Sequence, residues 1–466
     1  MLVAGLDVGG SSVKAWVASV DGDVLVEVGL ALSSLRPASH RVELDPVVWE
    51  SACRAALTAA VAEAARPGGD YLGVTVSTLR QGFVLLDAAG DPLGNGVLNS
   101  DRRGAAWMSV LAGTHGLTGH WPAPELTLPK LLAVQAEEPE RWAATSRVLF
   151  LHDWLVWRMT GVQATEASYA CAGGMADVAA RDWAVDLLDG CGIGTDRLAP
   201  VVEAGTVVGE LRDGWGLPAS LPVVAGCGDT QLAAMGVGGL ADGVVTVVAG
   251  SSTPVQAATA APVRDPLERP WVSTHAAPDR WAVEGNAGYP GTFSGWWESL
   301  VPGGPDAPSA GLLAVTAAPY WAEETWAVKP PASLLGLRAD TTAGQIRTAL
   351  REAHAYAVRG NVADLERALG RPASAVVVTG GAAADGRLAA LLADVLGREV
   401  HVAAGSTGVA RAGAALVGRA VGAHAHVPGL PSTVLPAGDR RPYDEPYARW
   451  CAAHAALRAA LPDDDA

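Results

Sequence analysis

Two stretches far apart in this chain share one pattern: an apolar run, an aspartate and a turn rich in glycine and serine. Residues 2–14 carry the pattern around Asp7, and residues 223–232 carry it around Asp229. A further apolar run, residues 246–249, ends in a similar turn. Apolar runs bounded by turn residues are typical of buried strands. The repetition predicts two similar halves that hold one ligand between them.

The order of the other elements predicts an α/β fold. Asp45 and Pro46 supply the N-cap and first-position proline of an Ala-rich helix, with strands expected on both sides of it. The second half alternates strands and helices in the same way. It includes a long helix expected over residues 345–369 and a closing helix over residues 408–421.

The chain is too long for one ordinary hydrophobic core, because it has 466 residues. We expect two domains, residues 1–221 and 222–466. Half of the residues are apolar and 18% are charged, which is a globular composition. The net charge of −16 argues against a nucleic-acid partner or an anionic membrane surface, because no basic stripe offsets the acid.

The five cysteines are scattered, without a CxxC pair or a neighbouring histidine cluster. Neither a cysteine-ligated metal nor a disulfide framework is therefore expected. The sequence opens directly into a strand pattern, and no apolar run reaches the ~18 residues of a membrane helix. We expect a cytoplasmic protein with no membrane partner.

Three Gly-rich turns at strand ends, residues 9–12, 250–253 and 380–382, suit a nucleotide. Glycine lets the backbone approach phosphate oxygens closely, and serine hydroxyls add hydrogen-bond donors. The chain has no Walker A motif, and the first turn leads into a second strand. A single turn of this kind is more simply a tight hairpin. Three of them in this order favour a phosphate cradle.

Asp7 and Asp229 each end a strand beside such a turn. A carboxylate within an apolar strand pattern is costly unless it is paired or bound to a metal. We therefore predict that Asp7 is a ligand, through water, for the Mg²⁺ that accompanies ATP. Asp229 would accept the proton of an attacking hydroxyl. The alternative for Asp229 is an ordinary helix N-cap, and Lys14 either reaches a phosphate or lies on the hairpin face.

Polar residues in loops after apolar strands are candidates for holding a polyol. They are Arg80, Gln81 and Asp101, with Asn99 beside them. Paired donors and acceptors of this kind orient sugar hydroxyls in binding sites. Taken singly, each residue is better explained as an ordinary residue of a solvated loop.

Taken together, the motifs resemble those of the FGGY carbohydrate kinases, over nearly the whole chain. Residues 226–231 (Gly-Cys-Gly-Asp-Thr-Gln) resemble the segment that holds the family's catalytic aspartate, and residues 249–252 resemble its Gly-Thr-Ser phosphate turn. Further resemblances stand at residues 5–14, 127–132, 152–161 and 379–385.

The resemblance implies two actin-like (ribonuclease H-like) ATPase domains around a central cleft. It also implies that ATP and Mg²⁺ bind mainly to the second domain and the sugar mainly to the first, with Asp229 as general base. Arg80, Gln81 and Asp101 fall where the family holds sugar. The ATP contacts indicated by the turns and by the resemblance are Gly9, Gly10, Ser11, Ser12, Lys14, Gly250, Ser251, Ser252, Gly380, Gly381 and Asp385.

The same resemblance does not identify the molecule that accepts the phosphoryl group. The leading hypothesis is ATP-dependent phosphorylation of a ketopentose, as in xylulokinase. The Met-His pair of xylulokinases is replaced here by Arg80-Gln81, which leans towards autoinducer-2 kinase and ribulokinase. The alternatives are thus a kinase of a signalling molecule such as autoinducer-2, or a catalytically silent sugar sensor of the same fold. A homodimer is expected from the family.

Overall fold

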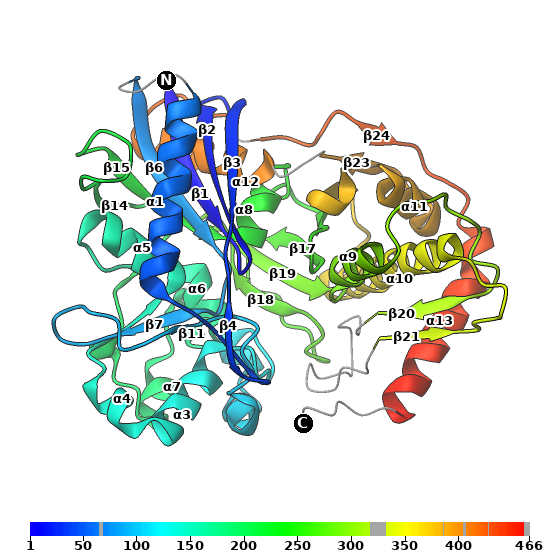
Figure 1. Ribbon diagram of the computed structural model, residues 1–466, viewed down its shortest axis with the longest axis horizontal. Coiled ribbons are helices and arrows are strands. Elements are labelled where there is room, and N and C mark those ends of the chain that lie inside the picture. Colours follow the sequence, from blue (N-terminus) through cyan, green and yellow to red (C-terminus); the bar gives the residue numbers. More distant parts are fainter. Residues whose placement is uncertain (65–68, 317–331, 385, 404–406, 427, 461–466) are drawn as a thin grey trace.

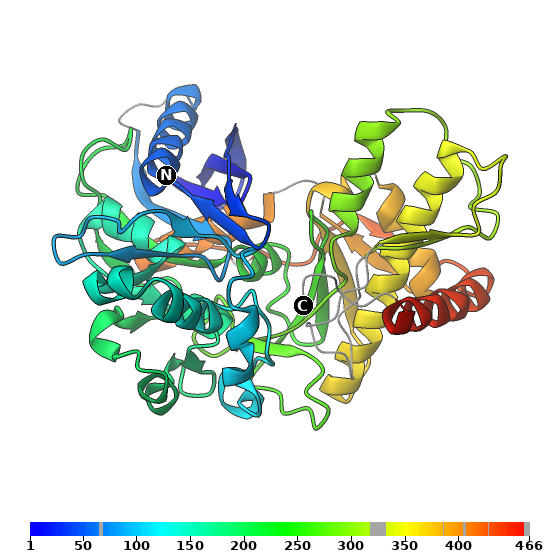
Figure 2. The same ribbon diagram turned by 60° about the horizontal axis from the view of Figure 1, so that its bottom comes forward.

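The computed structural model describes residues 1–64, 69–316, 332–384, 386–403, 407–426 and 428–460. These residues form two lobes, each built on its own large β-sheet (Figures 1 and 2). The α/β class and the two similar halves predicted from the sequence are therefore confirmed. Within the described residues, no helix is both long enough and apolar enough to cross a membrane.

The first lobe is organised on a six-stranded sheet in the order β14-β15-β6-β1-β2-β3. Strands β1, β2 and β3 form an antiparallel meander, whereas β6 and β15 run parallel to β1. The strand bounds are β1 (Leu2–Val8), β2 (Ser12–Ser19), β3 (Val24–Ala31), β6 (Tyr71–Thr78), β14 (Val207–Glu210) and β15 (Pro222–Gly228).

Helix α1 (Pro46–Glu63) covers one face of this sheet, as Figure 1 shows. It begins as the sequence predicts, because the Asp45 side chain accepts hydrogen bonds from the Val47 and Val48 backbone N–H groups. Its buried face, which includes Trp49 and Leu57, packs into the core with β1 and β2. The cap and the apolar face together place this helix on the sheet.

The second lobe repeats the plan with a seven-stranded sheet in the order β18-β19-β17-β16-β22-β23-β24. Strand β16 pairs with β17 antiparallel and with β22 parallel. The strand bounds are β16 (Val244–Val248), β17 (Pro254–Thr259), β18 (Trp271–Thr274), β19 (Trp281–Asn286), β22 (Ala375–Thr379), β23 (Val400–Val402) and β24 (Val434–Leu435). Helices α10 (Ala343–Leu369), α11 (Arg387–Leu396) and α13 (Arg441–Ala460) supply much of its core.

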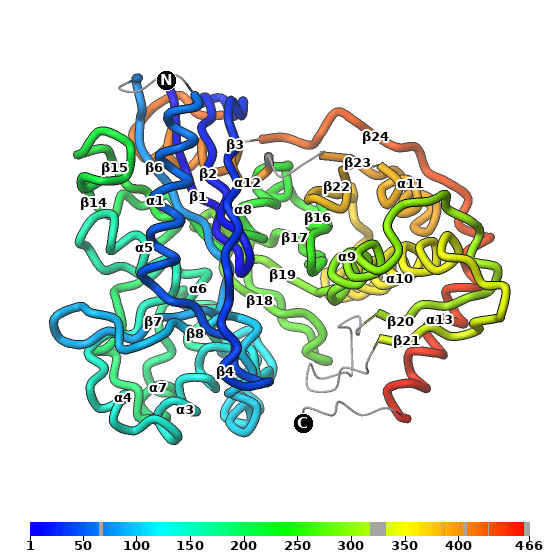
Figure 3. The backbone as a smooth tube through the Cα atoms, viewed as in Figure 1, coloured from blue at the N-terminus to red at the C-terminus, as the bar shows by residue number. Residues whose placement is uncertain are grey.

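Two helices near the C-terminus differ from the expectation. Helix α12 (Thr407–Ala420) lies where the closing helix was predicted, but α13 follows it. Moreover, α12 lies with the first lobe, beside β1 and β2, in Figure 3. Its Val409 and Ala412 pack in one cluster with Trp16. Gly5 and Gly413 make room for the indole of Trp16, since a Cβ at either would lie 2.2 Å or 2.6 Å from its ring.

The domain division expected at residue 222 does not follow the sheets. Strand β15 pairs with β6, so residues 222–228 complete the first sheet. Helix α8 (Asp229–Met235) continues directly from β15 and packs with α12 in the same cluster. We therefore propose a division between α8 and β16, with α12 returning to the first lobe. The apolar pattern around residue 222 marks a strand, but not which sheet the strand joins.

A five-stranded sheet extends the first lobe, in the order β4-β5-β8-β7-β9. Its strands are β4 (Leu35–Ala38), β5 (Arg41–Leu44), β7 (Phe83–Leu86), β8 (Gly96–Val97) and β9 (Arg147–Phe150). The nearby helices are α2 (His115–Thr118), α3 (Thr127–Glu137), α4 (Pro139–Ala144), α5 (Leu151–Thr160), α6 (Ala167–Ala172) and α7 (Val185–Gly190). Trp271 and Val272 of β18 join the core of this region, which ties the two lobes together at one end.

Short elements complete the described chain. They are the 3₁₀ turns Ala105–Leu111, Thr195–Arg197 and Gly381–Ala383, the strands β10 (Thr165–Glu166), β11 (Ala176–Asp177), β12 (Asp182–Trp183), β13 (Val201–Val202), β20 (Leu313–Val315) and β21 (Ser333–Leu335), and helix α9 (Pro290–Leu300).

Candidate active site

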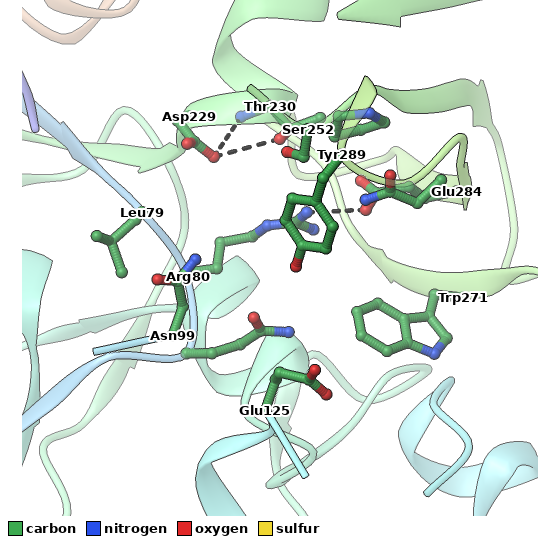
Figure 4. Close-up of a pocket in the computed structure, with 13 residues that line it drawn as sticks. Leu79, Arg80, Asn99, Glu125, Asp229, Thr230, Ser252, Trp271, Glu284 and Tyr289 are labelled. Atoms are coloured by element: carbon green, nitrogen blue, oxygen red, sulfur yellow. Dashed lines mark hydrogen bonds and ion pairs between the residues drawn. The ribbon is translucent and has the colours of Figure 1, made fainter. Parts of the chain in front are cut away.

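Two cavities meet between the lobes, and Asp229 lines both of them. The larger, about 560 Å³, is lined by the Gly-rich turns of both sheets. The smaller is lined by polar side chains from both lobes, including Arg80, Gln81 and Glu284 (Figure 4). We call them the cradle cavity and the polar cavity. A carboxylate on their common wall can touch a ligand in either one.

The cradle cavity brings together most of the residues predicted to contact ATP. The loop between β1 and β2 supplies Gly9, Gly10, Ser11, Ser12 and Lys14, and the loop after β16 supplies Gly250, Ser251 and Ser252. Gly380 follows β22 and also lines the cavity.

Gly380 also shows why a glycine is needed in the third turn. Its φ is +98°, and a Cβ there would lie 2.5 Å from the carbonyl oxygen of Ala249. The turn after β22 can therefore lie against the end of β16 only without a side chain. Gly381 does not line either cavity. Asp385 lies outside the described residues.

Asp229 is the first residue of α8, and the cap position belongs to Gly228. Asp229 Oδ1 accepts hydrogen bonds from the backbone N–H of Thr230 at 2.7 Å and from its hydroxyl at 3.2 Å. Neither bond uses Oδ2. The ordinary N-cap alternative therefore does not describe this residue, whose side chain faces the cavities in Figure 4.

Asp7 lines the cradle cavity from the end of β1. Burial and the nearby charge of Asp229 raise its pKa to about 7, against the opposing effect of Lys14. Lys14 itself pairs with Glu27 at 3.7 Å. Two neighbouring acids of this kind are able to hold a cation between them and a ligand.

These carboxylates fit Mg²⁺ by the chemistry of their donors. Mg²⁺ in nucleotide sites is held by one or two carboxylates, with phosphate and water oxygens completing the shell. Asp7 supplies one such carboxylate at the wall of the cradle cavity. Among the described residues, no group of three or more histidines, cysteines, aspartates or glutamates could form an all-protein metal site. The donor chemistry of Asp7 is therefore compatible with a metal that keeps phosphate and water ligands.

Helix α6 supports the end of β15 from behind. The Tyr169 hydroxyl donates to the Cys227 carbonyl and accepts from the Thr78 N–H, both at 2.9 Å. The Ser168 hydroxyl accepts from the Gly228 N–H at 3.0 Å and donates to Glu166. Burial raises the pKa of Glu166 to about 8. These side chains fix the two residues that precede Asp229.

The loop after β6 carries Arg80 and Gln81 into the polar cavity. Gln81 has a φ of +70°, which is uncommon for a residue with a side chain. Its carbonyl accepts hydrogen bonds from the Thr127 hydroxyl at 3.0 Å and from Lys130 Nζ at 2.9 Å. Lys130 is fully buried, and burial lowers its pKa to about 7. The Pro-Lys motif of α3 thus holds the loop that presents Arg80 and Gln81.

Asp101 does not line either cavity, although the sequence predicted a sugar contact there. Its carboxylate is fully buried and accepts hydrogen bonds from the Val42 N–H at 2.7 Å and from Arg103 Nε at 2.8 Å. Burial opposes ionisation, but the hydrogen bonds and charge of Arg103 hold the pKa of Asp101 below its usual range. Its oxygens are used to order the loop that begins at Leu98.

Several residues that line the polar cavity were not predicted from the sequence. They are Glu125 in the first lobe, and Trp271, Glu284, Asn286 and Tyr289 in the second. Glu284 offered one signal, since it is an acid that directly follows the apolar residues 281–283 of strand β19. The others stand in ordinary loop or strand contexts. Only the approach of the two lobes brings them to one place.

Comparison with known proteins places the chain among sugar kinases. Residues 2–236 match the N-terminal domain of the FGGY family of carbohydrate kinases, and residues 245–421 match its C-terminal domain. The xylulose kinase of Escherichia coli K12 is 29% identical over 423 residues, which cover 86% of each chain.

Two further proteins support this relationship. The putative sugar kinase YoaC of Bacillus subtilis strain 168 is 30% identical over 297 residues, which are 61% of this chain and 59% of that protein. The crystal structure of a xyloylose kinase from Brucella ovis superposes with a TM-score of 0.83 at 25% identity, covering 98% of this chain and 100% of that one.

Proposed function

The chain belongs to the FGGY family of carbohydrate kinases, and we propose that it transfers the γ-phosphoryl group of ATP to a hydroxyl of a ketopentose such as xylulose. The observation that carries the proposal is the position of Asp229 on the wall common to the cradle cavity and the polar cavity. A triphosphate in the first and a sugar in the second would meet at this carboxylate.

In this mechanism Asp229 is the general base. Its carboxylate takes the proton of the sugar hydroxyl, whose oxygen forms a bond to the γ-phosphorus. The bond from that phosphorus to the β,γ-bridging oxygen breaks, and the electron pair leaves with ADP. Positioning of the two substrates supplies much of the rate.

The turn residues of the cradle cavity would bind the phosphates. Backbone N–H groups of residues 9–12 and 250–252, with the serine hydroxyls, are suited to phosphate oxygens. Asp7 would hold Mg²⁺ through water, and the metal would supply charge compensation for the phosphates. Asn99, Gln81 and Glu284 offer acceptors and donors for sugar hydroxyls.

We add to this proposal a location and an assembly. ATP is the donor, so we place the protein in the cytoplasm, where ATP is made and used. We also propose a homodimer, which light scattering on the purified chain would test. A mass of about one chain, 47.5 kDa, would contradict it.

The proposal is tested by ADP release with Mg-ATP. The acceptor panel contains ketopentoses, pentitols, hexoses, glycerol and an autoinducer-2 precursor. We expect a ketopentose to stimulate turnover and Asp229→Asn to lower it by about 10²–10⁴-fold while sugar binding persists. Asp45→Asn is the matched control, because it also alters an aspartate at a helix start and asparagine caps equally well.

Other outcomes assign other functions. Turnover with the autoinducer-2 precursor alone would identify a kinase of a signalling molecule. Sugars that raise the melting temperature without raising ADP release would identify a sensor. Full activity in the Asp229→Asn variant would show that Asp229 is not the general base.

A further inference from the structure

One arginine lies on the wall of the cradle cavity at the edge of the five-stranded sheet. Arg36 belongs to the edge strand β4, and its side chain lines the cavity from the first lobe. Among the residues that the structure describes, its guanidinium forms no hydrogen bond or ion pair. A cation in this position is available to a ligand in the cavity.

The backbone around Arg36 is held in an extended conformation. Pro37 follows it, and a proline ring disfavours the helical conformation in the residue before it. On either side of Arg36, Leu35 and Ala38 pair with strand β5. The side chain is therefore presented from a fixed position on the backbone, although the strand itself is exposed.

The segment that carries this arginine connects two parts of the site. At its start, the Leu32 N–H donates to the carbonyl of Ser11, in the first Gly-rich turn, at 2.8 Å. After β4, the Val42 carbonyl accepts from the Leu98 N–H at 2.9 Å, directly before Asn99, which lines both cavities. The arginine therefore lies on the stretch of chain between the turn suited to phosphates and the loop that reaches the polar cavity.

The charges on the cavity wall show what this cation can do. Among the described residues, the charged side chains of the cradle cavity are the acids Asp7 and Asp229 and the cations Lys14 and Arg36. Lys14 is also paired with Glu27, at 3.7 Å. A triphosphate brings more negative charge than Mg²⁺ cancels, so an uncommitted cation favours its binding. Arginine suits this task because its planar N–H groups can bond two phosphate oxygens at once.

We propose that Arg36 binds the γ-phosphoryl group of ATP, donating hydrogen bonds to its non-bridging oxygens, and keeps this contact while the group passes to the acceptor. The inference rests on the proposed function for ATP as the bound nucleotide. Arg36 takes up no proton and forms no covalent bond, since a guanidinium stays protonated in proteins. Its effect is to stabilise the charge of the moving group, and electrostatic stabilisation of this kind accelerates phosphoryl transfer.

The test measures nucleotide binding by calorimetry without an acceptor, so that it does not depend on phosphoryl transfer. The probes are Mg-ADP and the Mg²⁺ complex of the β,γ-imido analogue of ATP, which keeps a γ-phosphoryl group but resists hydrolysis. In Arg36→Met we expect the Kd of the analogue to rise about tenfold or more, because a hydrogen bond between charged groups is lost. The Kd of ADP should change little, because ADP lacks the group that Arg36 contacts. Since the side chain is exposed, the melting temperature should not change.

Two further variants separate direct contact from net charge. Arg41→Met removes a positive charge from the other strand of the same hairpin, but Arg41 pairs with Glu137 and Glu138 and does not line the cradle cavity. This variant should bind both nucleotides as the unmodified chain does. Arg36→Lys keeps the charge but loses the planar pair of donors, so its Kd for the analogue should lie between those of Arg36→Met and the unmodified chain.

The results distinguish this inference from the proposed function. An Arg36→Met variant that binds the analogue as tightly as the unmodified chain, or that binds both nucleotides equally more weakly, would overturn the inference. Equal weakening in Arg41→Met would also overturn it, because the effect would then be one of net charge. An unmodified chain that binds neither nucleotide would overturn both the inference and the proposed function. A chain that binds the analogue through Arg36 but releases no ADP with any acceptor would leave the inference standing and overturn the proposed transfer.

Discussion

Two groups of buried carboxylates lie in the first lobe, and they differ in how their charge is balanced. In the Arg103 cluster, Arg103 is fully buried and pairs with Glu43, Asp101 and Glu138 at 2.5, 2.8 and 3.2 Å. Despite burial, the arginines hold the pKa of Asp101 and of Glu138 below the usual range.

For Asp7 at the cradle cavity and Glu166 behind strand β15, the balance of charge is reversed. Burial and Asp229 raise the pKa of Asp7 to about 7, and burial raises that of Glu166 to about 8. Among the described residues, neither carboxylate has a hydrogen bond or ion pair to an arginine in the structure. Carboxylates that carry their own cation are part of the fold. Carboxylates kept without one form a place where a cation can bind, or where a proton is held.

Replacing Arg103 should have the largest effect on the stability of the fold. Arg103→Met would leave the buried carboxylates of Asp101 and Glu43 without their arginine, and we expect the free energy of unfolding to fall by about 3–5 kcal/mol. Urea denaturation of the purified variant measures it.

Arg41→Met is the control for that experiment. Arg41 pairs with Glu137 and Glu138 beside the same cluster, but its side chain is 24% exposed. We expect a loss of at most about 1 kcal/mol. Equal losses of unfolding free energy in the two variants would show that the buried Arg103 cluster stabilises the fold no more than a partly exposed ion pair does.

A second variant tests whether the hydrogen bonds of Tyr169 behind Asp229 stabilise the fold, position Asp229 for catalysis, or both. Tyr169→Phe removes the hydroxyl that joins Thr78 to Cys227. We expect the unfolding free energy to fall by about 1–2 kcal/mol because two buried backbone groups lose a partner. We also expect kcat to fall about tenfold with little change in KM, because a shift of Asp229 affects the transition state most.

Steady-state kinetics over the acceptor that the unmodified chain uses would show this split. A purely structural role for Tyr169 would lower Tm but leave kcat of the folded fraction unchanged. Tyr71→Phe, which alters a tyrosine at the far end of β6, is the comparison variant.

A pH-dependent effect is expected from the carboxylate that holds a proton. The pKa of Glu166 is raised from 4.5 to about 8, so the folded chain binds a proton that the unfolded chain has released between those values. This contribution to stability is fully present below about pH 4.5 and is lost as the pH rises through about 8.

Glu166→Gln should remove that dependence. We expect a Tm close to that of the unmodified chain at pH 5 and a Tm a few degrees higher at pH 9. Scanning calorimetry at both values measures it, with Ser168→Ala to show the effect of losing the neighbouring hydrogen bond alone. An equal Tm difference at pH 5 and pH 9 would contradict the raised pKa.

Much of the site could be predicted from the sequence because it is local. The turn residues of the cradle lie directly after apolar strands, and parallel strands bring such loops to one edge of a sheet. Asp7 and Asp229 stand out for the same reason, as acids at the ends of buried runs. The helix that begins after Asp45 needed only its cap and its apolar spacing.

Only the tertiary structure decided what each polar side chain meets. Asp101 resembles a site residue in sequence, yet Arg103 and Val42 use its oxygens within one lobe. Glu284 stands out locally only as an acid in a buried strand, and its bond to Arg80 joins residues 204 positions apart. Strand β15 and helix α12 joined the first lobe for a similar reason. Local periodicity fixes which face of an element is buried, but the partner on that face depends on how distant elements pack.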